Sequence, residues 1–149
     1  MRVLLGCSPG GHLRQLYVLK PWWSDHEREW ITFPTEDALT LLADEKVTHA
    51  HHPTTRNIPN LLRNFVLVFG LLRRFRPDVV VSTGAAIAFP MFIWARLFGI
   101  RTVFIEVYDR IDNPTLSARL VRPFTDLFLV QWEQQLEHHR GAVLAGQLL

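Results

Sequence analysis

The sequence is informative first for what it lacks. Its 149 residues include one cysteine, Cys7, which excludes an intrachain disulfide framework and suits a reducing compartment such as the cytosol. The 16 Lys and Arg nearly balance the 14 Asp and Glu, and a net charge of +2 is too small for a dedicated nucleic-acid binder. No run reaches the ~18–20 apolar residues that a transmembrane helix needs. Because Met1 and Arg2 lead directly into a short apolar stretch, we expect no secretory signal.

Short β-rich runs alternate with longer helical stretches along the whole chain. This alternation predicts an α/β fold, in which βα units form a parallel sheet with helices on both faces. The clearest strand is 78–82, whose β-branched residues indicate burial on both faces. Further strands are expected at 3–5, 29–33, 46–51, 102–106, 127–130 and 142–144. Helices are expected at 11–20, 35–42, 57–76, 87–98 and 116–121, with Pro90 interrupting the fourth.

The segment Gly6-Cys7-Ser8-Pro9-Gly10-Gly11-His12 stands at the first predicted strand-to-helix turn, where open parallel sheets place ligands. It does not satisfy three motifs that it partly matches. A hydrolase nucleophile elbow at Ser8 would need an oxyanion donor from the next residue, but Pro9 has no backbone N–H. A P-loop would need Lys and Ser or Thr where His12 and Leu13 stand, and the G-x-G-x-x-G dinucleotide spacing is absent.

The chemistry of this loop nevertheless suits an anion. Consecutive glycines, Gly10 and Gly11, let the backbone approach a ligand closely, and N–H groups at a helix start favour negative charge. His12 is suited either to contact a phosphate or to act as a base near neutral pH. The alternative is a tight structural turn that carries an exposed histidine.

Two further strand ends are expected at the same edge of the sheet. The turn Ser82-Thr83-Gly84-Ala85-Ala86 follows the clearest strand, and Glu106 closes the strand after it. Because the carboxyl ends of parallel strands share one edge, the loops should converge on one cleft. An acidic group at the end of an apolar strand indicates function, and the alternative is that Glu106 is a solvated rim residue.

Four motifs in one order carry a resemblance that covers the chain from Met1 to about Gly146. They are Ser8-Pro9-Gly10-Gly11-His12-Leu13, Arg76-Pro77-Asp78-Val79-Val80-Val81-Ser82-Thr83-Gly84-Ala85, Ile105-Glu106 and Val130-Gln131-Trp132-Glu133. Together they resemble the acceptor-side half of a split GT-B glycosyltransferase, of the bacterial PssD/CpsF polysaccharide type. The eukaryotic counterpart of that type is the membrane-recruiting subunit of the UDP-GlcNAc transferase that adds the second sugar to dolichol-linked oligosaccharide. The chain is also similar, more distantly, to the N-terminal domain of MurG.

The resemblance implies a Rossmann-like domain equivalent to the N-terminal half of a GT-B enzyme, with residues 1–149 forming one acceptor-side half-domain. In such enzymes this half handles the lipid-pyrophosphate acceptor, whereas the donor-binding half holds most of the UDP-sugar. No cofactor is implied. His12 and Glu106 become the candidate catalytic residues, each as a base or a charge stabiliser. The residues that the resemblance places near the acceptor pyrophosphate are Ser8, Gly10, Gly11, Thr83, Gly84 and Ala85.

A lipid-linked acceptor requires contact with a bilayer surface. The predicted helix 60–76 has a broad apolar face and ends in Arg73, Arg74 and Arg76, a composition suited to docking on anionic lipid. The alternative is an ordinary core helix beside the sheet. We therefore expect a cytoplasmic protein that is peripherally attached to the inner face of the membrane.

Two groups of histidines raise the question of a metal site, namely His49, His51 and His52, and the pair His138-His139. No cysteine or carboxylate stands near them at ligand spacing, so we expect no metal.

Three functions are therefore compatible with the sequence. The first is a subunit of an inverting UDP-sugar glycosyltransferase that binds a lipid-linked saccharide acceptor at the membrane and is active only with a donor-binding partner. The second is a membrane adaptor with no residue in the reaction. The third is a free-standing nucleotide-binding enzyme. Nucleic acid is not expected as a partner in any of them.

Overall fold

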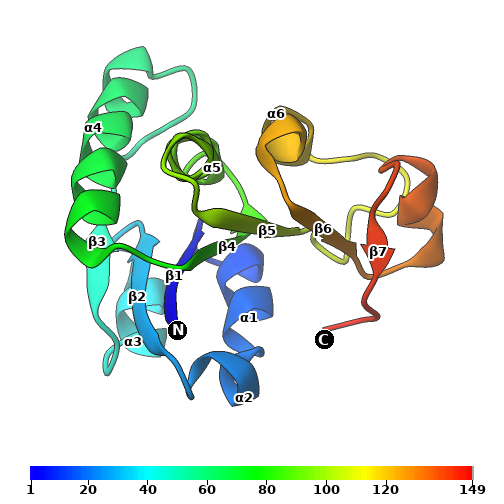
Figure 1. The fold of residues 1–149 in the computed structure, drawn as a ribbon, viewed down its shortest axis with the longest axis horizontal. Helices are drawn as coiled ribbons and strands as arrows, with labels where there is room; N and C mark the ends of the chain where they lie inside the picture. The colour runs from blue at the N-terminus through cyan, green and yellow to red at the C-terminus, as the bar shows by residue number, and fades with distance from the viewer. Residues whose placement is uncertain (149) are drawn as a thin grey trace.

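One parallel sheet organises the fold. The computed structural model describes residues 1–148, and its seven strands are ordered β3-β2-β1-β4-β5-β6-β7 (Figure 1). Every pairing between neighbours is parallel, which confirms the predicted α/β architecture. The strands are β1 (Arg2–Cys7), β2 (Glu27–Thr32), β3 (Val47–His49), β4 (Val79–Gly84), β5 (Arg101–Ile105), β6 (Leu127–Val130) and β7 (Val143–Leu144).

The helices lie on both faces of this sheet, as predicted. In Figure 1, α4, α5 and α6 lie on one face, and α1, α2 and α3 lie on the other. Two short 3-10 helices, η1 and η2, flank β6. The bounds are α1 (Gly11–Tyr17), α2 (Lys20–Trp23), α3 (Glu36–Leu41), α4 (Ile58–Phe75), α5 (Ala88–Leu97), α6 (Leu116–Val121), η1 (Arg122–Phe124) and η2 (Glu133–Glu137).

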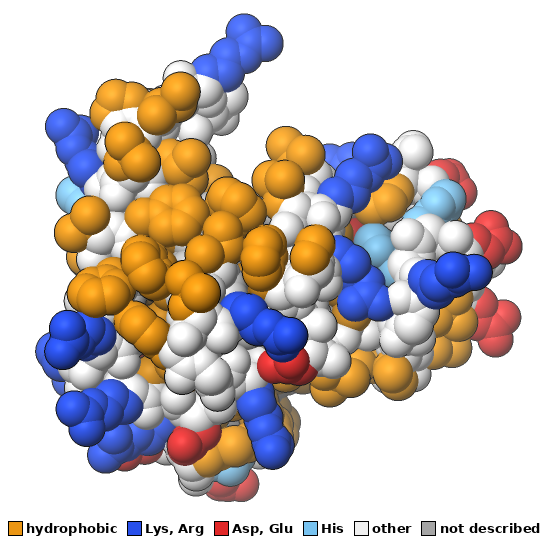
Figure 2. Space-filling view, turned by 45° about the horizontal axis from the view of Figure 1, so that its top comes forward, with side chains coloured by type: hydrophobic (Ala, Val, Ile, Leu, Met, Phe, Trp, Pro, Cys, Tyr) orange, Lys and Arg blue, Asp and Glu red, His pale blue; other side chains and the backbone are white. Residues whose placement is uncertain are grey.

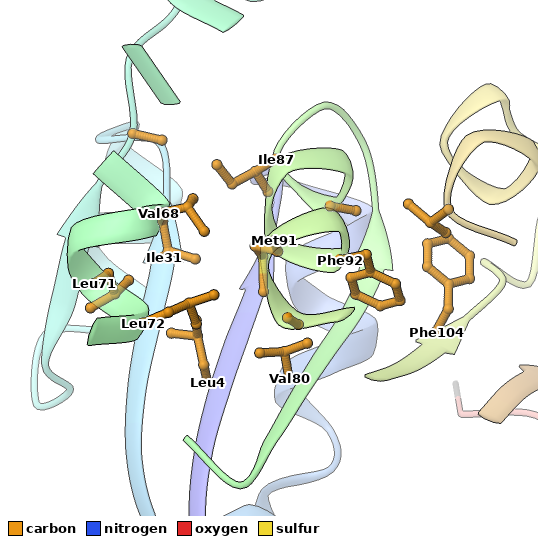
Figure 3. Close-up of a cluster of buried hydrophobic side chains, with 14 of the residues drawn as sticks. Leu4, Ile31, Val68, Leu71, Leu72, Val80, Ile87, Met91, Phe92 and Phe104 are labelled. Atoms are coloured by element: carbon orange, nitrogen blue, oxygen red, sulfur yellow. The ribbon is translucent and has the colours of Figure 1, made fainter. Parts of the chain in front are cut away.

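The central strands are buried on both faces, because alternate side chains of a strand point to opposite sides. Leu4 and Val80 belong to the core cluster under α4 and α5, where they meet helix residues such as Leu72 and Met91 (Figure 3). Their neighbours Val3 and Val79 belong to the second core cluster, under α1 to α3. The two clusters fix β1 and β4, and with them the loops that follow these strands.

Two helix predictions need correction. The expected helix 11–20 is two short helices, since α1 ends at Tyr17 and Pro21 lies in the first turn of α2. Pro90 does not interrupt α5, because it stands in the first turn of that helix, where backbone N–H groups have no partner within the helix. The strand predicted at 78–82 is longer than expected and includes Thr83 and Gly84.

One part of the sheet is open. Beneath β4, β5 and β6, on the side of α1, lies a hollow of about 1090 Å³ that no helix of residues 1–148 fills. Its walls are mainly the apolar side chains of these strands, and Arg96 and Asp126 stand among its polar lining residues. We call this the open sheet face. The strand side chains that line it are Val79, Val81, Val103, Ile105, Leu127 and Leu129.

Candidate functional site

The loops after β1, β4 and β5 meet at one edge of the sheet, as the sequence predicts. The strands run parallel, with Gly6 opposite Ser82 and Ser82 opposite Phe104. The three strands therefore end at nearly the same level of the sheet. The first loop then leads into α1 and the second into α5.

His12 joins the first loop to the second. Its Nδ1 lies 2.8 Å from the main-chain carbonyl oxygen of Thr83, and the hydroxyl of Thr83 donates to the carbonyl of His12 at 2.7 Å. Because a carbonyl oxygen can only accept, Nδ1 carries a proton. In the neutral ring, Nε2 is then unprotonated and able to accept a proton. The imidazole is half-buried in this position.

The turn after β4 needs glycine at one position. Gly84 has φ +117°, and a Cβ there would lie 2.9 Å from Oγ of Ser117 and 3.4 Å from Cε1 of His12. Ala85 follows in the left-handed region with φ 73°, and its N–H donates to Oγ of Ser117 at 3.0 Å. Ser117, which the sequence analysis did not identify, therefore holds the second loop in shape.

The first glycine loop is held by a carboxylate. Gly10 has φ +83° and open space where a Cβ would stand, and its N–H donates to Asp37 at 2.9 Å. The pKa of Asp37 lies below its usual value because the Thr35 hydroxyl and the Gly10 N–H both donate to the carboxylate. The negatively charged carboxylate of Asp37 therefore already accepts from one backbone N–H of this loop. Ser8 in the same loop is half-buried, and Gly11, the first residue of α1, is exposed.

Glu106 does not face an open cleft, which corrects the expectation from sequence. Its side chain is completely buried. Its carboxylate accepts from the N–H and hydroxyl of Thr115 and from the N–H of Val107, and Nε2 of His139 lies 3.3 Å away. These contacts fix the start of α6. A part for Glu106 in the reaction stays a prediction.

Three buried amides, which sequence reasoning did not place in the site, fix the loop after β5. Gln131 donates to Gln15 at 2.6 Å and to the carbonyl of Glu106 at 3.0 Å. Gln15 accepts from the N–H of Tyr108, and Gln135 donates to the carbonyls of Val107 and Arg110. Only Gln131 lay within a motif. Gln15 and Gln135 carry no local signal because their partners are distant in sequence.

The three arginines proposed to contact the membrane differ in their surroundings. Arg74 donates two hydrogen bonds, of 3.0 and 2.9 Å, to the buried carboxylate of Glu29. Burial raises the pKa of Glu29, but hydrogen bonds from Arg74 and Lys46 outweigh it, and the pKa is lowered. Arg74 is thus engaged in the fold, whereas Arg73 and Arg76 are exposed and form no ion pair with any described residue.

Among residues 1–148, no three His, Cys, Asp or Glu side chains come together as they would around a metal ion. None of the described helices is both long enough and apolar enough to cross a bilayer.

Comparison with known proteins identifies the family. A family model described as "Oligosaccharide biosynthesis protein Alg14 like" matches residues 33–148. The chain belongs to the Alg14-like family. This membership confirms the resemblance that the four sequence motifs carry.

Curated relatives of this Alg14-like chain are transferases or their subunits. It is 30% identical over 87 residues, 54% of its length, to a mouse protein named "UDP-N-acetylglucosamine transferase subunit ALG14". It is 31% identical over 136 residues, 84% of its length, to a Rippkaea orientalis protein named "UDP-N-acetylglucosamine--N-acetylmuramyl-(pentapeptide) pyrophosphoryl-undecaprenol N-acetylglucosamine transferase". The chain spans 40% and 38% of the length of these two relatives.

Solved structures confirm the fold of the Alg14-like chain. MurG from Acinetobacter baumannii superposes with a TM-score of 0.73 and 16% identity, over 89% of this chain and 42% of MurG. The S. aureus MnaA–UDP structure superposes with a TM-score of 0.79 and 13% identity, over 99% of this chain and 45% of MnaA. The fold is therefore the Rossmann-like half of a GT-B-type structure, as predicted.

Proposed function

We propose that residues 1–149 form the acceptor-side half of a two-component UDP-GlcNAc transferase, which binds a lipid-pyrophosphate-linked saccharide at the membrane. The observation that carries this proposal is the hydrogen-bonded contact between the two glycine loops through His12 and Thr83. The curated relatives of this family, which are named as transferase subunits, support the choice of this edge of the sheet as the place where an acceptor would meet the donor sugar.

The chemistry of the site follows from the tautomer of His12. The acceptor hydroxyl oxygen attacks the anomeric carbon of the donor, the bond to UDP breaks, and the hydroxyl proton passes to Nε2 of His12. The N–H groups of Gly10 and Ala85 donate to Asp37 and Ser117 in this structure, so phosphate oxygens of the acceptor would approach at Gly11 or would displace these two partners. Glu106 acts at one remove as a positioning residue, because its carboxylate holds Thr115, which caps α6 near Ser117. No cofactor or metal takes part.

A membrane-facing surface lies on α4 and α5. Ile58, Leu62 and Val66 are 68%, 60% and 73% exposed and recur at four-residue spacing along one face of α4. Figure 2 shows hydrophobic side chains gathered over these helices, with basic side chains around them. Arg73 and Arg76 at the end of α4 complete an amphipathic surface suited to anionic lipid. The protein is thereby recruited to the inner face of the membrane.

The open sheet face is the docking surface for the donor-binding subunit. Among the strand side chains that line it, Leu127 is exposed and Val103 and Leu129 are half-buried, and an apolar hollow that opens at the surface suits an interface. The curated ALG14 relatives are themselves named as subunits, and the chain spans about two fifths of the MurG-type transferase of R. orientalis. A second chain that supplies the rest of the transferase would bury the face.

The test is reconstitution. Co-expression with candidate donor-binding chains, followed by transfer from UDP-GlcNAc to a lipid-pyrophosphate sugar, should give activity only in the complex. Turnover by this chain alone would support the free-standing enzyme. Full activity of a complex that contains His12→Ala would support the adaptor.

A further inference from the structure

A basic hollow lies outside the site described above. It has a volume of about 430 Å³ and lies between α6, η1 and the segment after η2. Figure 2 shows Arg and His side chains gathered on this part of the surface. Neither glycine loop contributes to it. Its lining residues are Pro114, Ala118, Arg119, Arg122, His138, His139 and Arg140.

The charge of this hollow is not neutralised. Arg119, Arg122 and Arg140 form no ion pair with any carboxylate of residues 1–148, and no acidic side chain is among the lining residues. Glu106 is the acidic group behind the hollow, but it is completely buried, and its carboxylate accepts from Thr115 and Val107 and lies 3.3 Å from Nε2 of His139. Three guanidinium groups around one concave surface are therefore left without an anion.

The arginine at the centre is held in place before any ligand binds. The Arg122 guanidinium donates to the carbonyl of Arg140 and lies over the Phe128 ring, with Cζ 4.9 Å from its centroid. Gly141 permits this approach, since a Cβ there would come within 3.3 Å of Nη2 of Arg122. A planar guanidinium fixed in this way still has donors for a phosphate, which it can bind through two hydrogen bonds at once.

We propose that Arg119, Arg122 and Arg140 form a second anion site, the arginine pocket, which binds a phosphate group separate from the acceptor pyrophosphate. An anionic phospholipid headgroup is the source that the surroundings favour. Leu116 and Leu120 are 72% and 44% exposed and share one face of α6 with Arg119, at spacings of three and four residues. This face combines apolar and cationic groups as interfacial helices do. The choice of lipid rests on the membrane contact proposed above.

The experiment separates a built site from general charge attraction. The full chain is floated with vesicles of phosphatidylcholine, with and without phosphatidylglycerol, and is titrated with glycerol 3-phosphate. The variants are Arg119→Gln/Arg140→Gln, which removes two charges, and Arg119→Lys/Arg140→Lys, which keeps the charges but loses the guanidinium geometry. Both positions are exposed, so folding should persist. The control is Arg101→Gln, an exposed arginine at the start of β5.

We expect the Gln variant to lose about fivefold in binding to anionic vesicles for each charge removed. The Lys variant should also bind more weakly than the wild type, and the control should not change. If the Lys variant binds as the wild type does, the pocket proposal is overturned and only diffuse attraction remains. If glycerol 3-phosphate binding needs the two arginines but vesicle binding does not, the pocket stands with a soluble phosphate ligand. If both variants bind vesicles as the wild type does and no glycerol 3-phosphate binding is detected, the pocket is overturned, whereas the proposed membrane contact through α4 is unaffected.

Discussion

Nδ1 of His12 donates to the carbonyl of Thr83 over 2.8 Å, so the backbone of one glycine loop determines which nitrogen of the other loop's histidine is free. This relationship sets the orientation of His12, the proposed base, before any acceptor arrives. The second loop thus orients this histidine through its main chain, without a reactive side chain of its own.

The first prediction concerns that base. In the reconstituted complex, His12→Ala should lower kcat for sugar transfer by about 10²–10⁴-fold, because a positioned general base contributes that much. The thermal midpoint should change little, since the ring is only half-buried. His49→Ala is the matched control, because His49 is an exposed histidine at the end of β3. Loss of activity in the control as well would contradict a specific role for His12.

The second prediction concerns the turn after β4. Gly84→Ala should lower the free energy of unfolding by about 1–3 kcal/mol, because alanine is strained at φ +117° and its Cβ meets Ser117. Gly70→Ala in α4 is the control, since nothing lies within 4 Å of a Cβ there. Alanine should stabilise that helix position by about 0.5–1 kcal/mol. Urea denaturation measures both changes. An unchanged free energy of unfolding for Gly84→Ala would show that the loop relaxes around the added Cβ.

The third prediction concerns the Glu29–Arg74 pair. Arg74→Ala should destabilise the protein by about 1 kcal/mol at pH 7, because Lys46 remains and the Arg74 side chain is 53% exposed. The folded pKa of Glu29 lies below its usual value of 4.5, so the pair stabilises the fold above that pH. This stabilisation disappears as the pH falls through the lowered pKa. The difference between wild type and variant should therefore narrow in acid, whereas Arg73→Ala should show no such pH dependence.

The fourth prediction concerns Asp37 as a competitor for the loop donor. Asp37→Ala frees the Gly10 N–H and removes a negative charge, so inorganic pyrophosphate should bind several-fold more tightly by isothermal titration. Asp37→Asn should give a smaller gain, because the amide oxygen can still accept from Gly10. Glu36→Ala, at the exposed neighbouring position, is the control. Weaker binding by Asp37→Ala would mean that the carboxylate holds the loop in its binding shape.

The fifth prediction concerns the apolar stripe on α4. Leu62→Ser/Val66→Ser should reduce partition into anionic vesicles by about tenfold or more, since a fully buried side chain of this size contributes about 1.5–3 kcal/mol. Arg73→Gln/Arg76→Gln should weaken binding further at low salt. Leu39→Ser, at an exposed leucine of α3 on the other face of the sheet, should have no effect. Unchanged partition of the stripe variant would remove α4 from the membrane surface.

Much of the fold could be predicted because its signals are local. The β-branched run of β4 and the glycine turns mark where the strands end, and the parallel arrangement then brings the loops together. The motif order was specific enough to predict the family. Where prediction failed, proline was the misleading signal: Pro21 and Pro90 both suggest a break, but each stands in the first turn of a helix, where proline is tolerated.

The contacts that shape the site could not be predicted. Asp37 reaches Gly10 across 27 residues, and Glu29 reaches Arg74 across 45. Such pairs obey no period of helix or strand, so nothing in the pattern joins them. Glu106 is an example. From sequence, an acidic residue at a strand end is expected to be accessible, but in the fold Thr115, at the start of α6, donates to its buried carboxylate.

The open sheet face has a consequence for the amount of this protein that stays folded in a cell. Anything that binds the folded chain and covers that face stabilises it by mass action, by about 2.7 kcal/mol when the partner is present at a hundred times its dissociation constant. Its lifetime should then depend on the supply of that partner, with surplus copies removed by proteolysis. Pulse-chase decay of the chain, measured with and without the partner gene, would reveal this dosage coupling.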